Sequence, residues 1–379
     1  MPDATMIKQD FEFINKVEYD VEYLVPQSNW LRVGDQEFNS INAAEKVING
    51  SGTMTVIADT TISFEQTISE NKNVTLDLNG HSVSFTQTIN LRGNQEIIDS
   101  VGNGSFNNLR NDMFTNTGTT VIKGGSYSSE LGSAVANTGT LTIKDGNYDP
   151  KGKPTINTSN KFVFDGGELR STDNYAVLNT GDFTMNGGDI NTHGGIDNRG
   201  TFTLNGGSVE GTIGPSLHNY GGKSYIVNGT LVNNHTNAVN APCGEVNIKG
   251  GEVISNITDS ITVGSAYNCG TAELNVSGGL VEGQTNGIVM TASNPINISG
   301  GHVIGRENNG FNSGFKSTIT GGVIEGGTYG VYVYGGTTNI GENDGNIEVD
   351  APVLKGELYG LKLDPFESNF FANRGQLAH

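Results

Sequence analysis

The sequence predicts an all-β protein built as a parallel β-helix, in which the chain winds through successive coils that stack on one another. Three observations support this fold class. A glycine motif recurs about every 22 residues, apolar residues occupy fixed positions around it, and a second turn motif precedes it. The chain has 379 residues, of which 55 are glycine and 34% are apolar. An elongated fold with a thin core requires no larger apolar share.

The glycine motif is periodic along most of the chain, which is typical of repeat architectures. Its defining glycines are Gly125, Gly146, Gly167, Gly188, Gly207, Gly229, Gly251, Gly279, Gly301 and Gly322. The residue three positions before each glycine is apolar, as at Ile226 and Ile248, and so is the residue two positions after it, as at Leu231 and Val253. We expect these positions to face a core that continues from coil to coil.

A turn of the form Asn-x-Gly precedes several of the glycines by about nine residues, and a short alternating segment lies before that turn. Asn137, Asn179, Asn198 and Asn219 each begin such a turn. One period therefore contains three short strands, which is too little for a propeller blade of about 40 residues. Equivalent residues of neighbouring coils would stack about 4.8 Å apart. A column of asparagines would then form a hydrogen-bonded ladder.

Over residues 34–345 the chain resembles the right-handed, single-stranded parallel β-helices of the pectate-lyase-like superfamily. The resemblance rests on the coil repeat and on residues 38–50 and 73–83, the latter containing Leu-Asp-Leu-Asn-Gly-His. It implies a short helix that plugs the N-terminal end of the stack. Ser40 can cap that helix and Gly50 can stop it.

The sequence divides into four parts. Residues 1–33 alternate charged and apolar residues and are expected to form an N-terminal arm for docking or oligomerisation. Residues 34–118 would form the helix plug and early coils, and residues 119–340 the regular coils of about 22 residues. Residues 341–379 are expected to form a C-terminal cap, because an uncovered coil end would expose strand edges and core.

The charge and hydropathy of the chain exclude several kinds of partner. It carries 21 Lys and Arg against 40 Asp and Glu, a net charge of −19. This charge opposes binding to nucleic-acid phosphates and anionic lipids. No apolar run approaches the 18 residues of a membrane span, and the first residues lack the features of a secretory signal. We therefore expect either a mature form or another route of export.

Three carboxylates are candidates for catalysis. Glu168 and Asp189 follow their glycines by one residue and Glu210 follows its glycine by three, so coil stacking would bring them to one face. Glycosidases need two carboxylates about 5–10 Å apart. The alternative is a solvated acidic face. The Arg-x-Lys, Asn-Thr-Asp and Gly-His-Gly motifs of the superfamily's pectin-acting enzymes are absent, which disfavours catalysis.

Two further groups of residues are candidates for a role, the aromatic residues of the turns in ligand binding and the two cysteines in a covalent link between coils. Aromatic residues in the turns can stack on sugar rings, and the candidates for binding are Tyr220, Tyr267, Phe311 and Phe315. Cys243 and Cys269 occupy equivalent turn positions of consecutive coils, about 5 Å apart, which allows either stacked free thiols or a disulfide. The six histidines have no compact metal-ligand spacing, so neither a metal nor another cofactor is predicted.

A rigid acidic β-helix with an N-terminal arm resembles the tailspikes and fibres of bacteriophage virions. The resemblance implies a homotrimer in the virion, in which residues 1–33 dock on other virion proteins and the helix meets host-surface polysaccharide. Two alternatives remain open. One is a bacterial adhesin, secreted or on the cell surface, and the other is a polysaccharide hydrolase or lyase.

Overall fold

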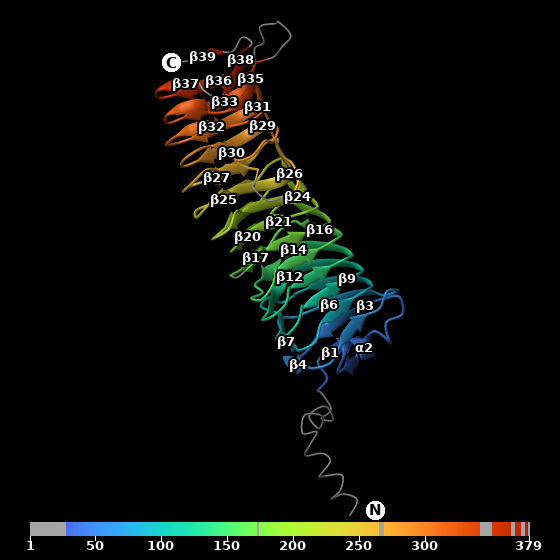
Figure 1. The fold of residues 1–379 in the computed structure, drawn as a ribbon. Helices are drawn as coiled ribbons and strands as arrows, with labels where there is room; N and C mark the ends of the chain where they lie inside the picture. Colours follow the sequence, from blue (N-terminus) through green and yellow to red (C-terminus); the bar gives the residue numbers. More distant parts are fainter. Residues whose placement is uncertain are drawn as a thin grey trace, which may run out of the picture.

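The described residues of the computed structural model form a single elongated stack of parallel coils with about 13 turns (Figure 1). The structure describes residues 28–172, 174–264, 269–341, 351–364, 368–372 and 376–377. Within them, the only helix is α2 (Ile41–Ala44). The predicted all-β parallel β-helix is therefore confirmed.

Each coil contributes strands to three parallel sheets, which we call A, B and C, and the chain runs through them in the order C, A, B. Several strands bend around a corner and belong to two sheets. Sheet A contains β3 (Ser51–Val56), β6 (Asn73–Asp77), β9 (Asn94–Ile98), β12 (Thr119–Ser129), β14 (Thr140–Tyr148), β16 (Lys161–Phe164), β19 (Asp182–Met185), β22 (Thr201–Leu204), β24 (Leu217–Ile226), β26 (Val239–Ile248), β29 (Ala272–Gly283), β31 (Ile296–Gly305), β33 (Ser317–Gly326), β35 (Gly336–Ile340) and β38 (Ser368–Ala372).

Sheets B and C share the corner strands with sheet A. Sheet B contains β4 (Thr60–Ile62), β7 (Ser82–Phe85), β10 (Ser105–Asn108), β17 (Glu168–Ser171), β20 (Asp189–Thr192), β23 (Ser208–Gly211), β25 (Thr230–Asn233), β27 (Glu252–Ser255), β36 (Val353–Gly356), β39 (Gln376–Leu377) and the second halves of β12, β14, β29, β31 and β33. Sheet C contains β5 (Gln66–Ile68), β8 (Ile89–Leu91), β11 (Phe114–Asn116), β13 (Val135–Asn137), β15 (Ile156–Thr158), β18 (Val177–Asn179), β21 (Ile196–Asn198), β28 (Ile261–Val263), β30 (Ile288–Met290), β32 (Asn309–Ser313), β34 (Tyr329–Val333), β37 (Tyr359–Leu363) and the first halves of β24 and β26.

The core follows the apolar positions of the repeat. Ile226 and Ile248 are register partners in neighbouring coils, as the spacing predicts. All twenty apolar residues that flank the ten repeat glycines are buried, each with at most 1% of its surface exposed. Aromatic rings stack along the same axis, with ring centroids 4.6 Å apart between Phe162 and Phe183 and 5.0 Å apart between Phe183 and Phe202.

The glycine corner between sheets A and B requires a residue without a side chain. Gly207 has a φ of +84°, and a Cβ atom there would lie 2.4 Å from the carbonyl oxygen of Gly188 in the preceding coil. Such a contact is too short for any other residue, and the positive φ also favours glycine. The periodic glycine thus permits both the turn and the close spacing of the coils.

The predicted asparagine ladder runs inside the corner between sheets C and A. The side chain of Asn179 donates to Asn198 at 2.8 Å, and Asn198 donates to Asn219 at 2.9 Å. One coil has a threonine in the column, and Asn137 donates to the hydroxyl of Thr158 at 2.9 Å. All these residues are at most 1% exposed, so the ladder satisfies polar groups that water cannot reach.

The first described residues lie against the start of the stack. β1 (Leu31–Val33) pairs antiparallel with β2 (Gln36–Phe38) and with β3, and Trp30 is fully buried beside them. Ser40 caps α2 as expected, by accepting a hydrogen bond from the backbone N–H of Ala43 at 3.1 Å. The helix ends at Ala44, well before Gly50. The backbone hydrogen bonds of residues 46–48 reach back only three residues, which tightens the chain into turns.

The predicted terminal parts are only partly described. Residues 1–27 of the expected arm lie outside the described residues, as do residues 342–350, 365–367, 373–375 and 378–379 of the expected cap. At the C-terminal end, β36 and β37 continue the parallel pairing of sheets B and C. The roles proposed for these parts remain predictions.

Candidate functional site

The three candidate catalytic carboxylates lie on the outer side of sheet B. Glu168 of β17 and Asp189 of β20 are register partners in adjacent coils. Glu210 of β23 is the partner of Asn191, two residues farther along β20. Coil stacking therefore brings these residues to one face, as the repeat spacing predicts. The register establishes where these residues lie, and their catalytic role stays a prediction.

Two of these carboxylates already have strong partners within the protein. Glu168 Oε1 accepts a hydrogen bond from Arg170 Nε at 2.6 Å, and this bond and the charge of Glu168 raise the pKa of Arg170. Glu210 accepts hydrogen bonds from the side-chain amides of Asn234 at 2.6 Å and Asn191 at 3.5 Å. Both carboxylates therefore act as hydrogen-bond acceptors in an open polar surface.

A hollow of about 400 Å³ lies on this face of sheet B. It is lined by Asp149, Arg170, Asn191, His193, Thr212 and Ile213, among others. His193 Nδ1 lies 3.0 Å from the backbone oxygen of Thr172, which fixes the orientation of the ring. The charged and amide side chains of the hollow provide both hydrogen-bond donors and hydrogen-bond acceptors to a ligand.

A second group of functional side chains lies on the outer side of sheet C and in its adjoining turns. Tyr175 precedes β18, Asp197 belongs to β21, Arg199 follows β21, and His218 and Tyr220 belong to β24. We call these five residues the ring cluster. They come from three successive coils, and Asp197 and His218 are direct register partners.

Asp197 forms the base of the ring cluster and is only 2% exposed. Its Oδ2 accepts hydrogen bonds from Arg199 Nε at 3.2 Å and Nη2 at 2.8 Å. Its Oδ1 lies 3.6 Å from His218 Nδ1, beyond hydrogen-bond distance. Burial alone would raise the pKa of Asp197, but interactions with His218 and Arg199 outweigh burial and lower it.

The aromatic rings form a continuous row above Asp197. The rings of Tyr175 and His218 are nearly parallel, at 9°, with centroids 6.2 Å apart, and those of His218 and Tyr220 are 5.7 Å apart. At the end of the row, Arg199 Cζ lies 5.5 Å from the centroid of Tyr220, within cation–π range. Aromatic faces beside N–H donors are the groups that recognise sugar rings.

Tyr175 reaches His218 because the intervening coil has a glycine at the crossing point. A Cβ atom on Gly194 would lie 2.7 Å from Tyr175 Cδ1. Any side chain at this position would therefore displace the ring. The glycine lets Tyr175 extend across one coil toward the next.

The four predicted binding residues have different outcomes. Tyr220 belongs to the ring cluster and is 37% exposed, whereas Tyr267 lies outside the described residues. Phe311 is fully buried, so its expected contact with a ligand is wrong. The alternation of β32 turns Phe311 inward, where it continues the apolar column of Ile288. Phe315 is partly buried and packs against the core.

Asp197, Arg199 and His218 were not among the residues that the sequence singled out. A signal for one of them was present in the repeat. Arg199 and Tyr220 are the middle residues of consecutive Asn-x-Gly turns, Asn198-Arg199-Gly200 and Asn219-Tyr220-Gly221. Because the flanking asparagines stack inward, the middle residues project outward from adjacent coils.

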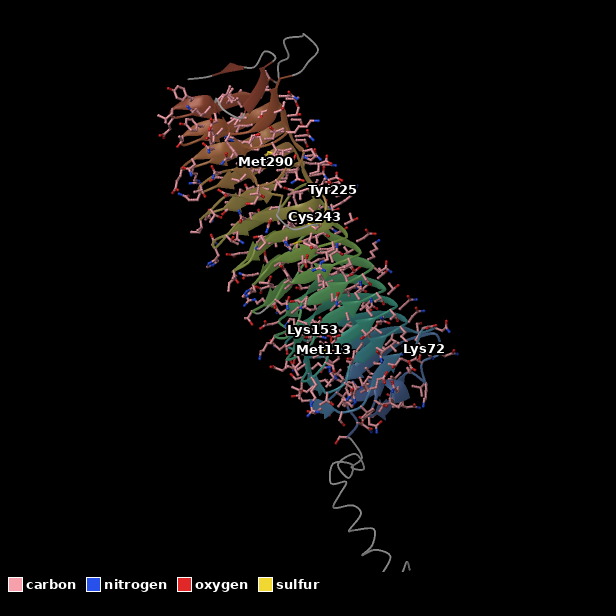
Figure 2. All side chains as sticks on the ribbon, in the orientation of Figure 1. Lys72, Met113, Lys153, Tyr225, Cys243 and Met290 are labelled. Atoms are coloured by element: carbon pink, nitrogen blue, oxygen red, sulfur yellow. A yellow bond between two sulfur atoms is a disulfide. The ribbon has the colours of Figure 1, made fainter. Side chains whose placement is uncertain are left out.

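Cys243 and Cys269 form a disulfide, with their Cα atoms 5.9 Å apart. The sequence left free thiols and a disulfide as alternatives, and the structure selects the disulfide. Figure 2 places Cys243 within the stack, away from both ends. The backbone oxygen of Cys243 accepts a hydrogen bond from Asn219 at 3.2 Å, so the asparagine ladder ends at the bridged coil.

The described residues contain no group of three or more His, Cys, Asp or Glu side chains that could hold a metal ion. Across the same residues, no helix has the length and apolar character needed to cross a membrane. Comparison with known proteins finds no matching family model, no matching curated protein and no matching solved structure. The fold defines the chain's class, a parallel β-solenoid.

Proposed function

We propose that this chain is a virion attachment protein that presents a rigid β-helix to glycans on a host surface. The observation that carries the proposal is the row formed by Tyr175, His218 and Tyr220 on the flank of the rod. Flat aromatic faces pack against the C–H face of a pyranose, and neighbouring N–H groups hydrogen-bond its hydroxyls. Rigid strands hold these groups in place before the ligand arrives, which lowers the entropic cost of binding.

Two further features support a role outside the cell. The disulfide between Cys243 and Cys269 is a bond typical of oxidising environments such as the surfaces of virions and cells. The elongated stack of coils resembles the rods of phage tailspikes, which usually assemble as homotrimers. In this proposal, residues 1–33 join the other virion proteins and the coils project toward the host polysaccharide.

The experiment is to screen the full chain against a panel of bacterial surface polysaccharides and to determine the mass of the native assembly. The proposal predicts binding to at least one glycan and a trimeric mass. A strictly monomeric chain that binds no glycan would contradict it. Electron microscopy of the source particle or cell separates a virion protein from a bacterial adhesin, because the two differ in what the rod is attached to.

A polysaccharide hydrolase is the second candidate, and the pairing of Glu168 with Asp189 favours it. Adjacent coils are about 4.8 Å apart, which suits the two carboxylates of a glycosidase. The test is to measure new reducing ends in any polysaccharide that binds. Cleavage that disappears in both Glu168→Gln and Asp189→Asn would support hydrolysis, whereas binding without new ends would eliminate it.

A further inference from the structure

The ring cluster exposes a cation and hides the anion that holds it. The side chain of Arg199 is 50% exposed, whereas that of Asp197 is 3% exposed. Asp197 uses the Nε and one Nη2 hydrogen of the guanidinium. Since a guanidinium has five N–H donors, about three remain for a ligand. An approaching molecule therefore meets hydrogen-bond donors and positive charge.

Other cations near the cluster are differently placed. Lys223, the next cation along the chain after Arg199, pairs with Glu245 across the coils at 3.0 Å, and both of these side chains reach solvent. Arg170 on sheet B pairs with Glu168, whose side chain is 28% exposed. In both pairs the carboxylate is exposed beside the cation, so an anionic ligand would meet a negative charge as well as a positive one. Arg199 differs because its carboxylate lies beneath it.

The base of the cluster is incomplete within the described residues. Asp197 Oδ1 and His218 Nδ1 are both buried and have no hydrogen-bond partner, although they lie 3.6 Å apart. Buried polar atoms nearly always find a partner in native proteins. Asp197 thus acts as a positioning residue, with one oxygen fixing Arg199 and the other facing His218.

We infer that the ring cluster binds an anionic sugar, whose carboxylate or sulfate group pairs with Arg199 while its ring packs on Tyr220, the ring beside that guanidinium. The inference rests on the proposed attachment function and adds the chemical class of the glycan. A planar guanidinium suits both oxyanions, because each offers two oxygens to parallel N–H donors. The chain's net charge of −19 makes nonspecific capture of polyanions unfavourable, so binding at this site depends on specific contacts.

The test is a glycan array of uronate and sialate oligosaccharides with their carboxyl-reduced counterparts, and of sulfated galactans with their desulfated counterparts. The full chain should bind a charged member at least about tenfold more tightly than its neutral counterpart, a difference of about 1.4 kcal/mol. The carboxylate and sulfate arms distinguish the two sources of the anion.

The variants assign binding to the cluster. Arg199→Gln and Tyr220→Ala should each weaken binding at least about tenfold, and Tyr220→Phe should bind nearly as the parent does, because it keeps the ring. Matched controls are Arg306→Gln, an exposed arginine that follows β31 and lies outside the ring cluster and the hollow on sheet B, and Tyr225→Ala, whose ring lies 5.3 Å from Lys249 Nζ. Both controls should leave binding unchanged. Arg199→Lys, which keeps the charge but not the planar fork, should show partial loss.

Each result has a defined meaning. Equal affinity for charged and neutral counterparts, or loss of binding in Arg306→Gln as large as in Arg199→Gln, overturns the inference while leaving glycan attachment in place. Failure to bind any glycan on the array or on the polysaccharide panel overturns the proposed function as well. Thermal unfolding of every variant identifies any that fail to fold. If Arg199→Gln or Tyr220→Ala does not fold, the binding of the conservative variants Arg199→Lys and Tyr220→Phe is compared with that of the parent instead.

Discussion

Replacing Asn198 by alanine should destabilise the protein by about 2–3 kcal/mol. Asn198 is fully buried and accepts a hydrogen bond from Asn179 at 2.8 Å. It donates to Asn219 at 2.9 Å, to the backbone oxygen of Lys223 at 3.1 Å and to Ser224 at 3.0 Å. A buried hydrogen bond contributes about 1 kcal/mol net, and an orphaned partner costs about 1–3 kcal/mol.

Two of the partners keep other contacts, which limits the loss. Asn179 still donates to the backbone oxygen of Thr201 at 2.8 Å, and Asn219 still accepts from Ser224 at 2.8 Å. The matched control is Asn297→Ala, because Asn297 donates to Asn275 at 2.8 Å on an exposed surface. Water replaces that bond, so the control should cost no more than about 0.5 kcal/mol.

Denaturant unfolding measures the free energy, and amide hydrogen exchange locates the change. Because each coil contacts only its neighbours, exchange should accelerate mainly in β18, β21 and β24. If Asn198→Ala and Asn297→Ala destabilised the protein equally, or if exchange rose evenly along the rod, the buried ladder would not have the role assigned to it.

Three further predictions concern the core, the disulfide and pH. Phe183→Ala should cost about 3–5 kcal/mol in denaturant unfolding, because the ring is buried between two others. Replacing Cys243 and Cys269 together by serine should cost about 2–4 kcal/mol, seen as a lower thermal midpoint that added reductant no longer changes. Folding lowers the pKa of Asp197 below its ordinary 3.8, so its carboxylate stabilises the fold above that pH and loses this contribution as pH falls through the lower value. Unfolding measured from about pH 2 to 5 should therefore show a weaker acid dependence in Asp197→Asn; an unchanged dependence would refute this role.

The repeat made the coil and its register predictable. A fixed apolar residue three positions before each glycine can form a continuous core only if equivalent residues lie over one another, as Ile226 and Ile248 do. The asparagine ladder followed from the same argument. Phe311 was misassigned because it was taken for a turn residue, whereas the two-residue alternation of β32 turns it into the core.

The ring cluster was less accessible from sequence. Arg199 and Tyr220 are the middle residues of equivalent Asn-x-Gly turns in adjacent coils, so the sequence alone predicts that they lie side by side. The contact between Tyr175 and His218 depends instead on a side chain that crosses a whole coil where Gly194 has no Cβ atom. The repeat spacing identifies which residues occupy equivalent positions in successive coils. It does not identify which side chains extend past the neighbouring coil to contact a residue two coils away.

The disulfide between consecutive coils has a mechanical consequence. The hydrogen bonds between coils run along the rod, so tension between its ends loads them in series and peels off one coil at a time. A freed coil of about 22 residues lengthens from about 4.8 Å to about 70 Å. The covalent bond from Cys243 to Cys269 keeps the chain between them out of this extension. Peeling from either end therefore passes through the bridge without freeing the residues between the two cysteines, and a fully pulled rod would fall short of the length of an unbridged chain by the length of that loop.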